Sequence, residues 1–252
     1  SERSRTVIVS ISSTSFLNGW GQLLQTKTQS EVSGQYIVSG QAEYNHQGLP
    51  VKQYLPNFTA NDSSVLDALD TSRPHSKIVY DAFGRVKQTT NPDGTYASIF
   101  YDDTFITRID ENGHKQMTNY DIRGNLLERY EYAGADGRSP YYPAQTFLEY
   151  GYTHYTHDPL NNLIITRDDH GNQINITYDT LGRKRSMIDP DMGTLFYNYD
   201  LNGNLINQKD AKGQTISFTY DAINRLTKKA NAGGMGGTTY TYDDPGMNFS
   251  KG

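Results

Sequence analysis

A Tyr-Asp dipeptide that returns about every 21 residues is the feature that most limits how this chain can fold. The dipeptide begins at Tyr80, Tyr101, Tyr120, Tyr178, Tyr199, Tyr220 and Tyr242. Degenerate copies stand in the same frame at Tyr44 and at His157. Self-similarity at a fixed period indicates that the chain lays one small structural unit repeatedly beside the last.

Each copy contains a four-residue turn signal, which is Asp or Asn, two further residues, and then Gly or Asn. From Asp158 to Asn231 these signals follow one another at alternating steps of 10 and 11 residues. Turn signals at this kind of spacing are typical of all-β proteins. The first side chain can accept the N–H two residues on, and the fourth residue enters the left-handed region that Gly and Asn tolerate best. We therefore predict a bulged hairpin turn at each signal.

The repeat is thus defined by its Tyr, by the residue that opens the turn and by the residue that closes it. We predict structural roles for Tyr44, Gly48, Tyr80, Asp81, Gly84, Gly94, Tyr101, Gly113, Tyr120, Asp121, Gly124, Asp158, Asn161, Gly171, Tyr178, Asp179, Gly182, Gly193, Tyr199, Asp200, Gly203, Gly213, Tyr220, Asp221, Asn224, Tyr242 and Asp243. An apolar residue also returns two positions after most turns, at Val86, Leu126, Leu163, Leu205 and Leu226. Lys184 is the exception.

The segments between the turns alternate apolar and polar residues with a period of two. In one of them, Ile216, Phe218 and Tyr220 fall on one face of an extended strand, and Ser217 and Thr219 fall on the other. Strands of this kind suit an antiparallel sheet that is buried on one side only. We therefore predict an all-β fold, an antiparallel meander of hairpins. Open twisted sheets rarely exceed about 10 strands without curling, and about 15 are expected here, so the sheet should curve or spiral.

The chain divides into an array and less regular segments. Residues 1–55 are predicted to be degenerate strands that lead into the array, and residues 56–77 an inserted loop in which 65–69 could form one helical turn. The array covers 78–252, with a second inserted loop at 133–145. Because the last repeat stops where another strand should begin, we expect the array to continue in a longer protein.

Composition excludes several classes of protein. Apolar residues, counted without Tyr and with Gly, make up about 36% of the chain against an expected ~45–50%, so one thick core is not expected. The chain has no Cys and therefore no disulfide framework. It has no apolar run of about 18 residues, which argues against a membrane span. Its net charge of -5 argues against nucleic-acid binding.

The candidate chemical sites are better explained as turns. Paired acids could hydrolyse glycosides, but nearly every Asp opens a turn. Asp168 and Asp169, and the run 189–193, hint at calcium but lack the series of oxygen ligands that a calcium loop supplies. His154 and His157 are three residues apart, which on a strand places them on opposite faces. We predict no catalytic, cofactor-binding or metal-binding residue, no cofactor and no enzymatic activity.

The repeat resembles a known family. Residues 80–86, 178–183 and 199–205 are similar to the YD (Rhs) repeat, and the resemblance extends over 78–250. Residues 36–54 are similar to the region just before the YD array in the B-type subunits of ABC toxin complexes. The resemblance implies a spiral β-sheet that forms part of a hollow shell around a cleaved toxic domain, as in Rhs proteins and in the B and C subunits of these toxins. Teneurins have a more distantly similar barrel.

The resemblance implies a structural function for the chain, which is a wall segment of a shell that encloses a toxic cargo domain in a larger secreted or injected protein. The alternative is an extracellular carbohydrate-binding or adhesion module, because aromatic faces stack on sugar rings. Expected partners are the remainder of the shell, the enclosed toxin domain and other toxin-complex subunits, with glycans in the alternative. The expected location is secreted or extracellular, as part of a larger bacterial protein.

Overall fold

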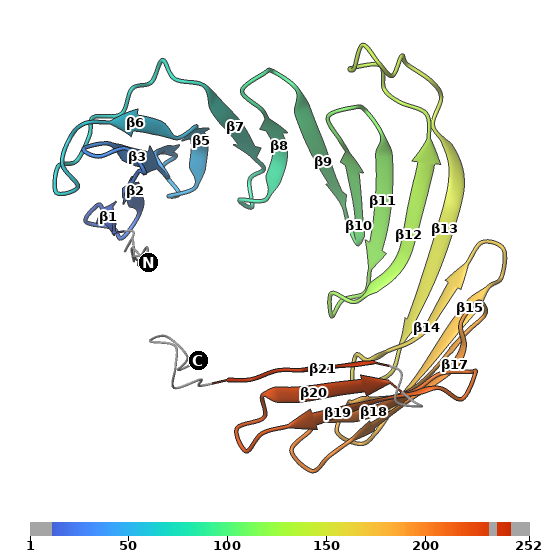
Figure 1. Cartoon of the computed structure of the whole chain (residues 1–252). Coiled ribbons are helices and arrows are strands. Elements are labelled where there is room, and N and C mark those ends of the chain that lie inside the picture. Colours follow the sequence, from blue (N-terminus) through green and yellow to red (C-terminus); the bar gives the residue numbers. More distant parts are fainter. Residues whose placement is uncertain (1–11, 232–235, 243–252) are drawn as a thin grey trace, which may run out of the picture. The chain divides into compact units, whose positions relative to one another are not determined.

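The computed structural model describes residues 12–231 and 236–242, which form strands joined by turns and loops (Figure 1). Every regular element of this described part is a β-strand, and consecutive strands of the repeat region pair antiparallel. The predicted fold class, an all-β antiparallel meander, is confirmed. The described part of the chain also holds no helix that is long and apolar enough to cross a membrane.

The chain forms two compact units. The first unit consists of Ser1–Gln116 and Ala133–Leu148, and the second consists of Met117–Tyr132 and Glu149–Gly252. The strand β11 (Lys115–Tyr120) contains the boundary between them.

The first unit contains two antiparallel sheets. In the smaller sheet the order is β1-β2-β3-β6, built from β1 (Ser13–Leu17), β2 (Leu23–Gln29), β3 (Tyr36–Ser39) and β6 (Asn57–Thr59). In the larger sheet each strand pairs with the next, through β4 (Ala42–Tyr44), β5 (Pro50–Tyr54), β7 (His75–Tyr80), β8 (Val86–Thr90), β9 (Tyr96–Asp102) and β10 (Phe105–Ile109). The first three strands therefore form a separate sheet with β6, and β4 is the first strand of the larger sheet.

The second unit continues the meander with one strand for every half repeat. Its strands are β12 (Leu126–Ala133), β13 (Leu148–His157), β14 (Leu163–Asp168), β15 (Gln173–Tyr178), β16 (Lys184–Asp189), β17 (Gly193–Tyr199), β18 (Leu205–Lys209), β19 (Thr215–Tyr220), β20 (Leu226–Asn231) and β21 (Gly237–Thr239). From β13 to β21 each strand pairs antiparallel with its successor. A register shift lies beside the turns that begin at Asp158, Asp179, Asp200 and Asp221, as at Thr219/Tyr220, and it is the bulge that the turn signal predicts.

The sheets bury little apolar surface. In β19, Ile216, Phe218 and Tyr220 are half-buried, and Ser217 and Thr219 are exposed, so the period-two alternation predicts the burial correctly. Within the described residues only four apolar side chains are buried, and these are Val38, Tyr54, Ala135 and Leu195. The repeat sheet is therefore a single layer without a thick core.

Hydrogen bonds and an ion pair join the two segments predicted as inserted loops to neighbouring strands and turns. The segment 56–77 contains β6 and the beginning of β7. Residues 65–69 contain no helix, and Asp62 instead opens a turn in which its carboxylate accepts the N–H of Ser64 at 2.8 Å. The fully buried Lys27 on β2 reaches Asp67 Oδ2 at 3.2 Å and the carbonyl of Asp62 at 3.0 Å, which fixes this segment to the smaller sheet.

The loop 134–147 is anchored in the first unit. The N–H of Asp136 donates to the carbonyl of Gly113 at 3.2 Å, and Arg138 Nη1 donates to the carbonyl of Tyr96 at 3.0 Å. The Arg138 guanidinium also lies over the Tyr96 ring, 4.1 Å from its centre. The predicted insertion is therefore bonded to the neighbouring strands and turn.

Candidate functional site

In most of the Tyr-Asp turns the carboxylate that opens the turn accepts several hydrogen bonds from the turn itself, whereas Asp102 is the last residue of β9. Asp179 Oδ1 accepts the N–H groups of Leu181 and Arg183, both at 2.9 Å, and Asp179 Oδ2 accepts from Arg183 Nε at 2.7 Å. Asp81 and Asp221 make the same three bonds, with an Arg at the matching position.

Other copies replace this Arg by Asn without changing the arrangement. The carboxylate Oδ2 then accepts from the Asn side-chain amide, at 2.8 Å from Asn125 to Asp121 and at 2.9 Å from Asn204 to Asp200. Asp158 and Asp168 bind the amides of their own Asn in the same way. The residue after the turn thus donates a hydrogen bond to the second carboxylate oxygen. Arg and Asn both have a side-chain N–H that can do this, which explains why either residue occurs at this position.

The residue that closes each turn is left-handed, as the sequence predicts. At Gly203 φ is +88°, and at Asn224, where Asn replaces Gly, φ is +64°. The same region holds the other closing residues, namely Gly48, Gly84, Gly94, Gly113, Gly124, Asn161, Gly171, Gly182, Gly193 and Gly213. Asn is the replacement because it tolerates positive φ better than other residues with a Cβ.

The tyrosines of the repeat tie each hairpin to the preceding one. The hydroxyl donates to a backbone carbonyl at 2.8–3.0 Å, in the pairs Tyr44 to Leu23, Tyr80 to Pro50, Tyr101 to Val86, Tyr178 to Leu163, Tyr199 to Lys184, Tyr220 to Leu205 and Tyr242 to Leu226. Each acceptor lies two positions after the closing residue of an earlier turn. Because the acceptor is a backbone group, its side chain is free to vary, which explains the exception at Lys184.

The Arg of one turn also covers the Tyr of the next repeat. The guanidinium carbon lies 4.1 Å from the ring centre in the pair Arg85 and Tyr101, and 4.8 Å in the pair Arg183 and Tyr199. Arg225 stands 4.5 Å from the Tyr242 ring in the same way. We call the turn acid, the Arg or Asn after the turn, the next Tyr and its carbonyl acceptor the repeat clasp. The sequence predicts the acid and the Tyr of this clasp but misses the Arg, although Arg follows the closing residue at 85, 183 and 225.

The protonation states of the repeat clasp suit a structural unit. The N–H of Arg183 lowers the pKa of the Asp179 carboxyl, and the Asn204 amide lowers the pKa of Asp200. Burial raises the pKa of the Tyr199 hydroxyl. At neutral pH Asp179 and Asp200 are therefore ionised acceptors and Tyr199 is a protonated donor, as their hydrogen bonds require.

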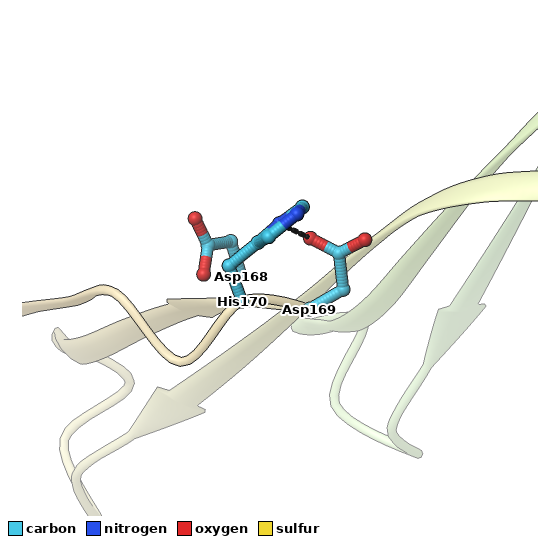
Figure 2. A group of neighbouring side chains, drawn as sticks. All are labelled: Asp168, Asp169 and His170. Atoms are coloured by element: carbon cyan, nitrogen blue, oxygen red, sulfur yellow. Dashed lines mark hydrogen bonds and ion pairs between the residues drawn. The ribbon is translucent and has the colours of Figure 1, made fainter.

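One turn brings together three side chains that could ligate a metal ion, and Figure 2 shows them. Asp169 Oδ1 lies 2.6 Å from His170 Nδ1, and the candidate ligand atoms of Asp168, Asp169 and His170 lie within 4.8 Å of one another. However, both oxygens of Asp168 already accept hydrogen bonds from Asn172, each at 2.7 Å. The arrangement is that of a repeat turn.

The remaining site residues occupy the places that the repeat requires. Asp189 Oδ1 accepts the N–H groups of Asp191 and Met192, so the second calcium candidate is also a turn. Tyr120 is the last residue of β11. Asp243 lies outside the described residues.

This geometry defines a class of protein, namely a single-layer sheet built from hairpin repeats that are clasped by Tyr and Asp. The RHS Repeat family model matches residues 199–234, which contain the complete clasp formed by Asp200, Asn204, Tyr220 and the Leu205 carbonyl. The predicted resemblance to the YD-repeat family is confirmed there. The comparison with curated proteins gives no match.

Solved structures share the fold over most of the chain. TcdB2-TccC3 without its hypervariable C-terminal region is 18% identical with a TM-score of 0.68, and the match covers 90% of this chain and 13% of that chain. The complex TcdB2-TccC3-Cdc42 matches with the same values. The Photorhabdus luminescens Tc holotoxin pore is 17% identical with a TM-score of 0.69, again over 90% of this chain and 13% of the other. The chain therefore spans about an eighth of the proteins that it matches.

Proposed function

We propose that this chain is a wall segment of a hollow shell that encloses a toxic cargo domain within a larger secreted or injected protein. The observation that carries the proposal is the repeat sheet with one half-buried apolar face and one exposed polar face, as in β19. A sheet must cover its apolar face against something, and this sheet buries few apolar side chains of its own. A wall with contents on one side meets that requirement.

The repeat clasp supports a mechanical role. Each Tyr hydroxyl joins one hairpin to a hairpin formed earlier in the chain, so the sheet grows by adding identical bonded units. Neighbouring units in such an array stabilise one another, and the array can be extended without redesign. The fold shared with the Tc toxin structures agrees with this role, and the toxic nature of the cargo rests on that similarity.

The two faces of the sheet suit a wall with different surroundings on its two sides. In β19 one face carries Ile216, Phe218 and Tyr220, which are half-buried, and the other carries Ser217 and Thr219. The aromatic and aliphatic face would line the hollow and offer weak apolar contacts to an incompletely folded cargo. The tyrosines of the clasp already donate their hydroxyls to backbone carbonyls, which favours this role over glycan binding.

Single-particle cryo-electron microscopy of the natural polypeptide that contains this chain tests the proposal. We expect a hollow particle with these strands in its wall and additional density inside it. Proteinase K should spare the enclosed segment in the intact particle and cleave it after the shell is opened with urea. A filled globular domain, or an enclosed side that is digested as fast as the outside, would refute the proposal.

A further inference from the structure

The Tyr-Asp turns of the second unit carry exposed apolar residues at their centres. The five turns 121–124, 158–161, 179–182, 200–203 and 221–224 each place one large aliphatic side chain in solvent, and these are Ile122, Leu160, Leu181, Leu201 and Ile223. Their exposure ranges from 65% at Ile223 to complete at Leu201. We call these five turns the YD rim.

The turns of the YD rim lie side by side in one row. Asn125 Nδ2 donates to Asn161 Oδ1 at 3.0 Å, which links the first two turns, and Asn204 Nδ2 donates to Asn224 Oδ1 at 2.8 Å, which links the last two. Arg183 Nη1 donates to the carbonyl of Asp200 at 3.2 Å and links the third turn to the fourth. Successive turns of the rim are two strands apart, which sets a pitch of about 10 Å.

The opposite edge of the same sheet is different. Hairpin turns of a meander alternate between the two edges, so the turns at 168–171, 189–193 and 210–213 face the other way. Their central positions hold Asp169, His170, Pro190, Asp191, Met192, Ala211 and Lys212, so Met192 is the one large apolar side chain among them. Turn geometry by itself favours small and polar residues. The aliphatic residues of the YD rim therefore serve something other than the turn, and a row of exposed apolar side chains marks an interaction surface.

We propose that the YD rim is a docking surface for a second YD rim, so that two copies of this chain associate rim to rim. The acids of the rim are already bonded within it: Asp179 and Asp221 pair with Arg183 and Arg225 at 2.7 and 2.6 Å, and the carboxylates of Asp121, Asp158 and Asp200 accept hydrogen bonds from the side-chain amides of Asn125, Asn162 and Asn204. The one charged residue at a rim centre, Arg123, donates to the carbonyl of Pro159. A row of aliphatic side chains whose neighbouring polar groups are already bonded within the turns suits an apolar partner.

The pitch and the area of the row also fit a second rim. A partner with the same spacing of about 10 Å can receive every aliphatic side chain of the row between two of its own. Five aliphatic side chains bury about 100 Å² each, so two copies bury about 1,000 Å² together, which is the lower bound for a specific interface. The inference is independent of the proposed enclosure, because a wall that holds nothing could make the same contact.

Sedimentation velocity of the full chain, from about 1 to about 200 µM, tests the proposal. We expect wild type to shift toward dimer as concentration rises. Leu201→Asp, which adds a charge to the rim, should raise the dissociation constant about tenfold or more. Met192→Asp on the opposite edge is the matched control and should leave the dissociation constant within about twofold of the wild-type value. Circular dichroism checks that both exposed substitutions leave the fold intact.

Cross-linking adds the geometry of the contact. Leu181 is the central residue of the row, so in a two-fold symmetric contact it lies near its own copy. The chain has no Cys, so Leu181→Cys with a short bis-maleimide should give a covalent dimer, and Met192→Cys should not. The proposal is overturned by a monomer at every concentration, by association that survives Leu201→Asp, or by equal cross-linking at both edges. Survival in Leu201→Asp would place the contact elsewhere, such as at the open strand edges.

Discussion

Removing single hydroxyls from the repeat clasp should reveal how much each Tyr contributes to the stability of the array. Tyr199→Phe keeps the half-buried ring and the Arg183 contact but loses the 2.9 Å hydrogen bond to the carbonyl of Lys184. A net hydrogen bond of this kind contributes about 0.5–1.5 kcal/mol. Tyr178 and Tyr220 make equivalent bonds in the neighbouring repeats, each about 10 Å away. The triple variant should therefore lose about 2–4 kcal/mol, since distant sites are close to additive.

Urea denaturation followed by circular dichroism measures this loss. The midpoint should fall in each variant while the slope with urea stays unchanged, because the surface exposed on unfolding is the same. Tyr197→Phe is the matched control on the same strand, since within the described residues the Tyr197 hydroxyl has no hydrogen-bond partner. We expect it to change stability by less than about 0.5 kcal/mol. Equal losses in Tyr197→Phe and Tyr199→Phe, or no loss in either, would refute the clasp as a source of stability.

Three further predictions concern the turns and the buried ion pair. Gly203→Ala should lower the free energy of unfolding by about 1–2 kcal/mol in urea denaturation, because a residue with a Cβ is strained at φ +88°. No neighbouring atom would contact the added Cβ, so the backbone strain is the whole effect. Asn224→Gly, at φ +64°, should not lower the free energy of unfolding. The lowered pKa of Asp200 means that its contribution to stability is complete above its usual pKa of about 3.9 and is lost as the pH falls through the folded value. The urea midpoint should therefore drop below about pH 4, and Asp200→Asn should reduce that drop. Lys27→Met should cost about 3–5 kcal/mol, because it leaves the Asp67 carboxylate facing no cation, and adding Asp67→Leu should restore part of the loss in thermal unfolding. A double variant no more stable than Lys27→Met would contradict that account.

Repeat period and turn chemistry allowed much of the second unit to be predicted from the sequence. The left-handed conformation of the closing residues could be predicted, because Gly and Asn favour it and because it depends on a few adjacent positions. The burial of Ile216, Phe218 and Tyr220 followed from period-two alternation within one strand. The first unit was harder to predict. There β3 pairs with β6 across an irregular segment, and no period in the sequence joins these two strands.

The sequence by itself determined where the chain turns, which residues close the turns and which side chains share a face, because each of these depends on neighbours within one hairpin. Only the tertiary structure decided that Tyr199 donates to the carbonyl of Lys184, that Arg183 covers the Tyr199 ring, and that Lys27 is buried against the segment 61–67. The physical reason is that these contacts join residues brought together by strand pairing, and a backbone acceptor leaves no trace in the identity of its residue.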